Sequence, residues 1–101
     1  MQLMDSSRET NAAMSDLQGC MERLLLLRLD EIPVAGSDYE AGQNVDAYTN
    51  LHLSNETIVP TYPGYAAGGA IPDPLPIVLT LNWSDPRGHQ RRLTLSSMKT
   101  R

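Results

Sequence analysis

The chain contains no phenylalanine, and its only aromatic residues are one tryptophan and four tyrosines. A hydrophobic core must therefore be built mainly from aliphatic side chains, of which the larger ones each contribute roughly 1.5–3 kcal/mol when fully buried. A length of 101 residues suits one domain and is too short for two. The sequence thus predicts a single small domain with a thin aliphatic core.

Cysteine and long apolar runs are also scarce. Cys20 is the only cysteine, so an intrachain disulfide is excluded, and its apolar surroundings predict a small buried side chain. The longest apolar block runs from Leu24 to Leu27, far short of the about 20 residues that span a bilayer, and no signal peptide is recognisable. We therefore expect these 101 residues to be soluble as they stand.

An excess of positive charge is missing as well. The formal net charge is −4, which argues against a nucleic-acid-binding domain, because phosphate contacts need a basic surface. The exception is local, because no acid follows Asp85 but five basic residues do: Arg87, Arg91, Arg92, Lys99 and Arg101. Two interpretations stay open: this segment docks an acidic partner, or it is a solvated edge strand whose charges deter edge pairing.

The strongest helical pattern covers Ala12 to Leu29. The side chains that share one apolar stripe are Ala13, Leu17, Cys20, Met21, Leu24 and Leu27. The side chains opposite them are Ser15, Asp16, Glu22, Arg23 and Asp30. Ser6 with Glu9 has the spacing of a capping box, and Pro33 cannot continue the helix, so the sequence predicts a helix over about residues 6–32.

Three leucines, Leu25, Leu26 and Leu29, fall on the side of this helix that should be wet. The following segment, residues 33–47, lacks a period of either kind and is interpreted as a long loop. The apolar residues that can fold back from it are Ile32, Val34 and Tyr39. We expect the loop to cover Leu25 and Leu29, and Leu26 to contact a neighbouring subunit.

Chemistry-bearing residues form no convincing constellation. The carboxylates of Asp38, Glu40 and Asp46 offer calcium ligands, but no EF-hand spacing occurs. His52 and His89 each lack a partner at metal-ligand spacing and are interpreted as surface residues. No nucleophile-elbow, Walker or dinucleotide-binding spacing is present. We therefore predict no catalytic residue, no cofactor, no metal and no enzyme activity.

The second half of the chain carries strand patterns separated by a proline-rich loop. Residues 48–59 alternate in part and predict a first strand with a bend near residues 54–55. Residues 60–76 contain five prolines and three glycines and predict a surface loop. Its Tyr62 and Tyr65 either form a recognition surface or pin the loop to the body of the domain.

The clearest pattern is a β-hairpin formed by residues 77–83 and 90–98. The apolar side chains on one face of its first strand are Ile77, Leu79, Leu81 and Trp83. Residues 85–88, Asp-Pro-Arg-Gly, suit a type I turn closed by a glycine bulge. The hairpin face is expected to cover the helix stripe. This predicts an α+β fold with a long N-terminal helix packed on a small antiparallel sheet of three to four strands.

The segment from Leu75 to Met98 reads LPIVLTLNWSDPRGHQRRLTLSSM. Together with the N-terminal helix and the variable loop, it resembles the soluble domain of bacterial type IV minor pilins and type II secretion minor pseudopilins. The residues that match the family's final hairpin are Trp83, Asp85, Gly88, Leu93, Thr94, Leu95 and Met98. The resemblance covers about half of the chain.

This resemblance implies a pilin-like structural subunit that acts without catalysis in the priming or capping of a filament. Its partners would be other pilin or pseudopilin subunits. The full-length form would be anchored in the inner membrane by a helix segment absent from these residues, before assembly into a periplasmic or extracellular filament. The alternative is a small binding module that grips a peptide or glycan with residues 60–76. Across both readings, the candidate interaction residues are Leu26, Tyr62, Tyr65, Arg91 and Arg92.

Overall fold

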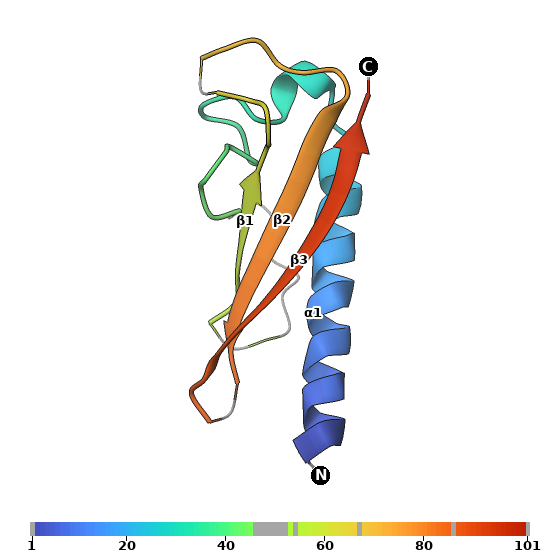
Figure 1. Cartoon of the computed structure of the whole chain (residues 1–101), viewed down its shortest axis with the longest axis vertical. Helices are drawn as coiled ribbons and strands as arrows, with labels where there is room; N and C mark the ends of the chain where they lie inside the picture. The colour runs from blue at the N-terminus through green and yellow to red at the C-terminus, as the bar shows by residue number, and fades with distance from the viewer. Residues whose placement is uncertain (1, 46–52, 54, 67, 86, 101) are drawn as a thin grey trace.

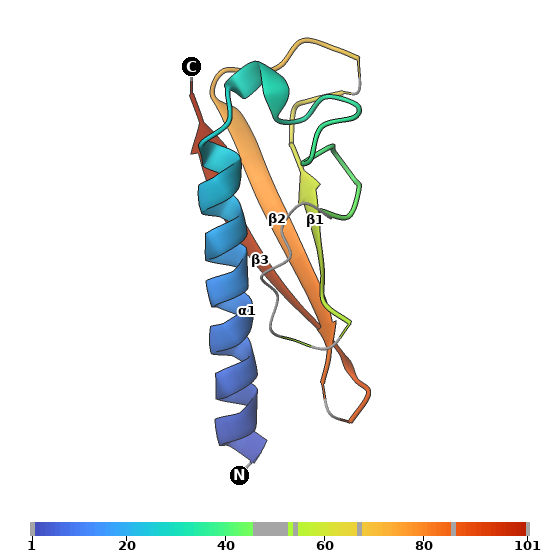
Figure 2. The ribbon, with the colours of Figure 1, turned by 180° about the vertical axis from the view of Figure 1, so that it is seen from behind.

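The computed structural model describes residues 2–45, 53, 55–66, 68–85 and 87–100. Its elements, in order, are α1 (Gln2–Leu25), the 3-10 turn η1 (Leu29–Glu31), β1 (Thr57–Thr61), β2 (Leu75–Ser84) and β3 (Gln90–Lys99). The three strands form an antiparallel sheet in the order β1-β2-β3. α1 lies along one face of this sheet and runs alongside β3, as Figures 1 and 2 show from opposite sides. The predicted α+β class is confirmed.

The apolar stripe of α1 faces the sheet as predicted. Five of its six positions are buried, namely Ala13, Leu17, Cys20, Met21 and Leu24, whereas Leu27 is half-buried. The prediction for Asp16 was wrong, because this residue is only 1% exposed. Asp16 lies three residues after Ala13 and four before Cys20, which places it at the edge of the buried stripe.

Both predicted ends of the helix were wrong. α1 begins at Gln2, so position 6 lies inside the helix and not at its start. At the other end the helix stops at Leu25 and tightens, because the N–H groups of Leu26 and Leu27 each donate to a carbonyl three residues back, at 3.2 and 3.1 Å. Arg28 is then extended, with φ −72° and ψ 148°, before the 3-10 turn η1.

The predicted hairpin is confirmed, with strands slightly longer than expected. The side chains of β2 alternate between buried and half-buried along its whole length, and the buried set is Leu75, Ile77, Leu79, Leu81 and Trp83. On β3, Leu95 and Leu93 pair with Leu79 and Leu81 and extend the same face. Pro76 lies inside β2 because the pairing with β1 ends at Val78, so no neighbour on that side needs its missing N–H.

The hairpin turn also follows the prediction. The N–H of Gly88 donates to the carbonyl of Asp85 at 2.9 Å, and Gly88 has a φ of +82°, a conformation that glycine adopts without strain. The N–H of Asp85 donates to the carbonyl of His89 at 2.9 Å and closes the hairpin.

The first strand begins later than predicted. β1 covers Thr57–Thr61 instead of residues 48–59, and the described residues 53, 55 and 56 precede it. Asn55 has a φ of 53°, which provides the expected bend. The predicted strand residues 48–52 and 54, with His52, lie outside the described residues. Pro60, expected in a loop, lies within β1, where the edge position tolerates it.

The segment after the helix folds back over its C-terminal end, as expected. Ile32 and Tyr39 are buried in the same core as the helix stripe, Leu29 is buried with them, and Leu25 is half-buried. Leu26 remains 85% exposed. The predicted division of the three leucines between covered and uncovered positions is therefore seen in the structure.

Candidate functional site

The C-terminal ends of α1 and β3 meet at one end of the molecule. The Nζ atom of Lys99 donates a hydrogen bond of 2.8 Å to the carbonyl oxygen of Leu25. A lysine at this position satisfies a carbonyl that the helix leaves without a partner and complements the negative end of the helix dipole. This bond fixes the place where the helix ends against the sheet.

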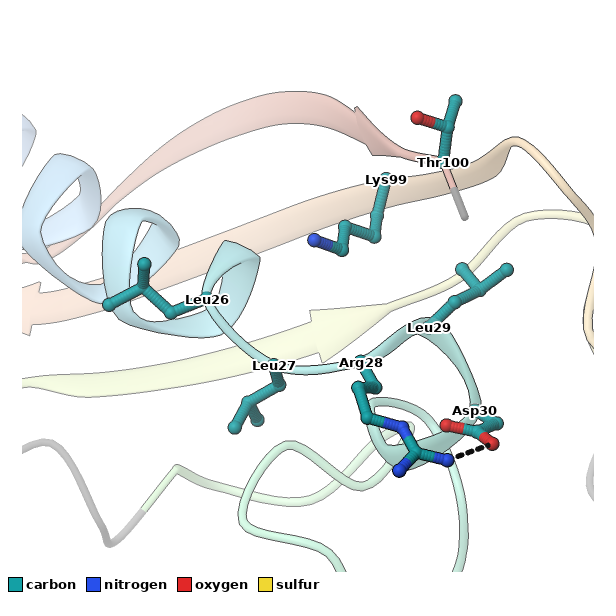
Figure 3. Close-up of a pocket in the computed structure, with 7 residues that line it drawn as sticks. All are labelled: Leu26, Leu27, Arg28, Leu29, Asp30, Lys99 and Thr100. Carbon is teal, nitrogen blue, oxygen red and sulfur yellow. Dashed lines mark hydrogen bonds and ion pairs between the residues drawn. The ribbon is translucent and has the colours of Figure 1, made fainter.

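A cleft of about 550 Å³, which we call the helix-end cleft, opens beside this contact. Its lining residues, drawn in Figure 3, are Leu26, Leu27, Arg28, Leu29, Asp30, Lys99 and Thr100. Leu26 and Arg28 are exposed, Leu27 is half-buried, and Leu29 is buried. The cleft therefore combines an uncovered leucine with polar groups around it.

Charges at the helix-end cleft are mostly paired. Arg28 Nη2 lies 3.1 Å from Asp30 Oδ2, and Arg28 Nε lies 3.2 Å from Glu31 Oε1. The hydrogen bond to Asp30 and the charges of both acids raise the pKa of Arg28 above its ordinary value. Such exposed pairs add little stability, but they hold the guanidinium in place. With Glu31, which pairs with Arg28 beside the cleft, the two acids balance Arg28 and Lys99. Balanced charge around an apolar surface suits a protein contact better than a small anion.

Among the residues that the structure describes, no cluster of three or more potential metal ligands occurs. Glu40 accepts a hydrogen bond of 2.8 Å from the N–H of Gly36, Asp38 is exposed, and Asp46 lies outside the described residues. Cys20 is fully buried, and this burial raises its pKa to about 11, so its thiol is not an activated nucleophile.

The sequence-predicted interaction residues lie in three separate places. Leu26 lines the helix-end cleft, whereas Arg91 and Arg92 lie at the other end of β3. Tyr62 is only 5% exposed, and its hydroxyl donates a 2.6 Å hydrogen bond to the carbonyl of Tyr39. Tyr62 therefore pins the loop to the core, and Tyr65 is half-buried beside it.

Sequence reasoning missed the role of Lys99 in the helix-end cleft. Its only signal is a basic side chain at the end of a strand, and 74 residues separate it from its partner Leu25. Arg28 was also missed, because the predicted helix continued through it and gave no sign of the extended turn.

No helix in the described part of the chain combines the length and the apolar character needed to cross a bilayer. Comparisons with protein-family models, curated proteins and solved structures give no match to this chain.

Proposed function

We propose that this chain is a structural minor subunit of a type IV pilus or type II secretion pseudopilus. It would act through subunit contacts in the priming or capping of a filament, without catalysis. The architecture is compatible with this role, because a long N-terminal helix packs on an antiparallel sheet that ends in a hairpin. The hairpin carries the residues on which the resemblance to minor pilins rests.

The observation that carries the proposal is the exposure of Leu26. Within the run of four leucines from Leu24 to Leu27, the fold buries Leu24, half-buries Leu25 and Leu27, and leaves Leu26 85% exposed. Covering this side chain would contribute roughly 1.5–3 kcal/mol to an association. Because Leu26 lies on the helix-end cleft, a neighbouring subunit that fills the cleft would bury the leucine at the same time.

The outward face of α1 offers a second contact area for a neighbouring helix. Gln18, Glu22 and Arg23 are exposed on α1. Polar side chains at helical spacing are compatible with reversible contact between subunits, and Leu26 would add the apolar anchor at the end.

The test compares the variants Leu26→Asp and Met98→Asp, each expressed in the native cells that contain the other filament subunits. Met98 is also exposed, at 63%, but it lies on β3. We expect both variants to melt like the parent, because neither carboxylate is buried. Leu26→Asp should fail to co-purify with the other filament subunits, whereas Met98→Asp should co-purify normally.

Normal co-purification of Leu26→Asp would contradict the proposal. An equal loss with Met98→Asp would also contradict it, because the effect would then follow the added charge and not the helix-end cleft.

A further inference from the structure

A second pocket, of about 160 Å³, lies between the N-terminal part of α1 and the hairpin end of the sheet. Its lining residues are Glu9, Thr10, Trp83, Arg91, Arg92 and Leu93, and we call it the tryptophan pocket. Trp83 is only 4% exposed, and its buried Nε1 atom has no hydrogen-bond partner among the residues that the structure describes. A buried N–H without an acceptor is unfavourable and rare in folded proteins, so this donor needs an explanation.

Two arginines bring further donors to the same pocket. The Nε atom of Arg91 bonds to Asp85 Oδ2, and the Nε atom of Arg92 bonds to Asn82 Oδ1, each at 3.2 Å. These hydrogen bonds use the Nε atom of each arginine and leave the terminal nitrogens uninvolved. Within the described residues, the structure gives the terminal nitrogens of both guanidinium groups no partner. Terminal guanidinium nitrogens match the two oxygens of a carboxylate.

The charge and the volume of the pocket limit the kinds of ligand that it can bind. Among the described lining residues, Glu9 is the one acid and Arg91 and Arg92 are the two bases. Because Asp85 pairs with Arg91 at 3.2 Å, the local charge is close to neutral, which suits a monoanion better than a phosphate dianion. A volume of about 160 Å³ holds a carboxylate with a short stem, so the remainder of a larger ligand would lie outside. β3 has no acidic residue and would favour an acidic partner along its length.

We propose that the tryptophan pocket binds a carboxylate carried by a peptide, either an acidic side chain or a C-terminus. The Nε1–H of Trp83 and the terminal nitrogens of Arg91 and Arg92 donate to its oxygens. This site lies at the opposite end of β3 from Lys99 and the helix-end cleft, so it does not depend on the filament proposal.

The single tryptophan provides a direct test, because ¹⁵N-labelled protein gives one indole Nε1–H resonance. The protein is titrated with three acetylated serine-glycine pentapeptides. The first has a central aspartate and an amidated C-terminus, the second is otherwise neutral with a free C-terminal carboxylate, and the third is neutral and amidated. We expect a saturable downfield shift of the indole resonance with one or both carboxylate peptides and none with the amidated neutral peptide. Which peptide acts identifies the source of the carboxylate.

Arg92→Gln should weaken this binding about tenfold, as expected for the loss of one charged hydrogen-bond donor. Arg87→Gln removes the same charge from an exposed position in the hairpin turn and should leave the affinity unchanged. Four results would overturn the proposal. The first is no saturable shift with either carboxylate, and the second is an equal loss of affinity with Arg87→Gln. The third is an equal shift with inorganic phosphate, and the fourth is an indole resonance that moves in Glu9→Gln without peptide. The last result would identify Glu9 as the acceptor already present.

Discussion

At the scale of single residues, one carboxylate organises the hairpin turn. The side chain of Asp85 is 4% exposed, and its Oδ1 accepts hydrogen bonds from the N–H groups of Arg87 and His89, at 2.9 and 2.8 Å. Its Oδ2 lies 3.2 Å from Arg91 Nε and 3.6 Å from His89 Nδ1. Burial alone would raise the pKa of Asp85, but these donors and charges lower it below its ordinary value.

We predict that Asp85→Asn lowers the stability of the domain at neutral pH and much less in acid. The folded-state pKa of Asp85 lies below the unfolded value of about 3.9, so its stabilisation is present above that pH and is lost as pH falls through the folded pKa. Urea midpoints of parent and variant at pH 7 and pH 3 measure the difference. Asp38→Asn, at an exposed position, serves as the control. An equal deficit of Asp85→Asn at both pH values would contradict the prediction.

Cys20 provides a second prediction at this scale. The thiol is fully buried, and burial raises its pKa to about 11, so little thiolate exists at pH 8. A thiol reagent at pH 8 should therefore label the native protein at least about tenfold more slowly than the protein in denaturant, because a thiolate is the reactive form. Labelling is followed by mass spectrometry over time. Equal rates in both conditions would show that Cys20 is accessible in the native fold.

At the scale of elements, the hairpin could be predicted and the end of the helix could not. Strand alternation and the residues of the turn are local features, so β2, β3 and the Gly88 turn follow from the sequence. The helix ends where Lys99 caps Leu25, and a contact between residues so far apart leaves no local mark. The predicted end of β1 was too early because Pro60 was taken as a strand breaker, although an edge strand accepts it.

The residues of the candidate site could be predicted only in part. Leu26 stood out in the sequence because helical spacing placed it on the polar side, and the structure leaves it exposed. The sequence did not predict the tryptophan pocket and indicated only Arg91 and Arg92, as candidate interaction residues. That the Trp83 N–H has no partner among the described residues depends on where α1 packs relative to β2, which residue spacing does not specify.

The contact between Lys99 and α1 leads to a prediction about the end of the helix. Lys99→Met should fray the last turn and lower stability by about 1 kcal/mol, because it removes both a charged hydrogen bond and a favourable charge at the helix C-terminus. Amide hydrogen exchange should rise at Leu25, Leu26 and Leu27 and stay unchanged at Leu17. Lys99→Arg retains a charged donor and should protect the turn better than Met. Unchanged exchange in Lys99→Met would show that the helix ends there without its help.

At the scale of the whole molecule, helix and sheet each supply the surface that the other must bury. An isolated helix is marginal in water, and a sheet of three strands needs one apolar face covered. Leu24 joins the two layers, since it is fully buried in the core that also contains Leu75 and Trp83. We therefore expect α1 and the sheet to unfold together as one cooperative unit.

Leu24→Ala tests this dependence. Removing a fully buried leucine side chain should cost about 2–5 kcal/mol, through lost burial and the cavity left behind, which is a large share of the stability of a small domain. Urea unfolding is followed by Trp83 fluorescence, which reports the sheet, and by far-UV circular dichroism, which reports mainly α1. Leu26→Ala makes the same chemical change at an exposed position and should alter stability by less than about 0.5 kcal/mol. Because both layers share one core, the two signals of Leu24→Ala should move to the same lower midpoint. Separate midpoints would show that the helix and the sheet unfold independently.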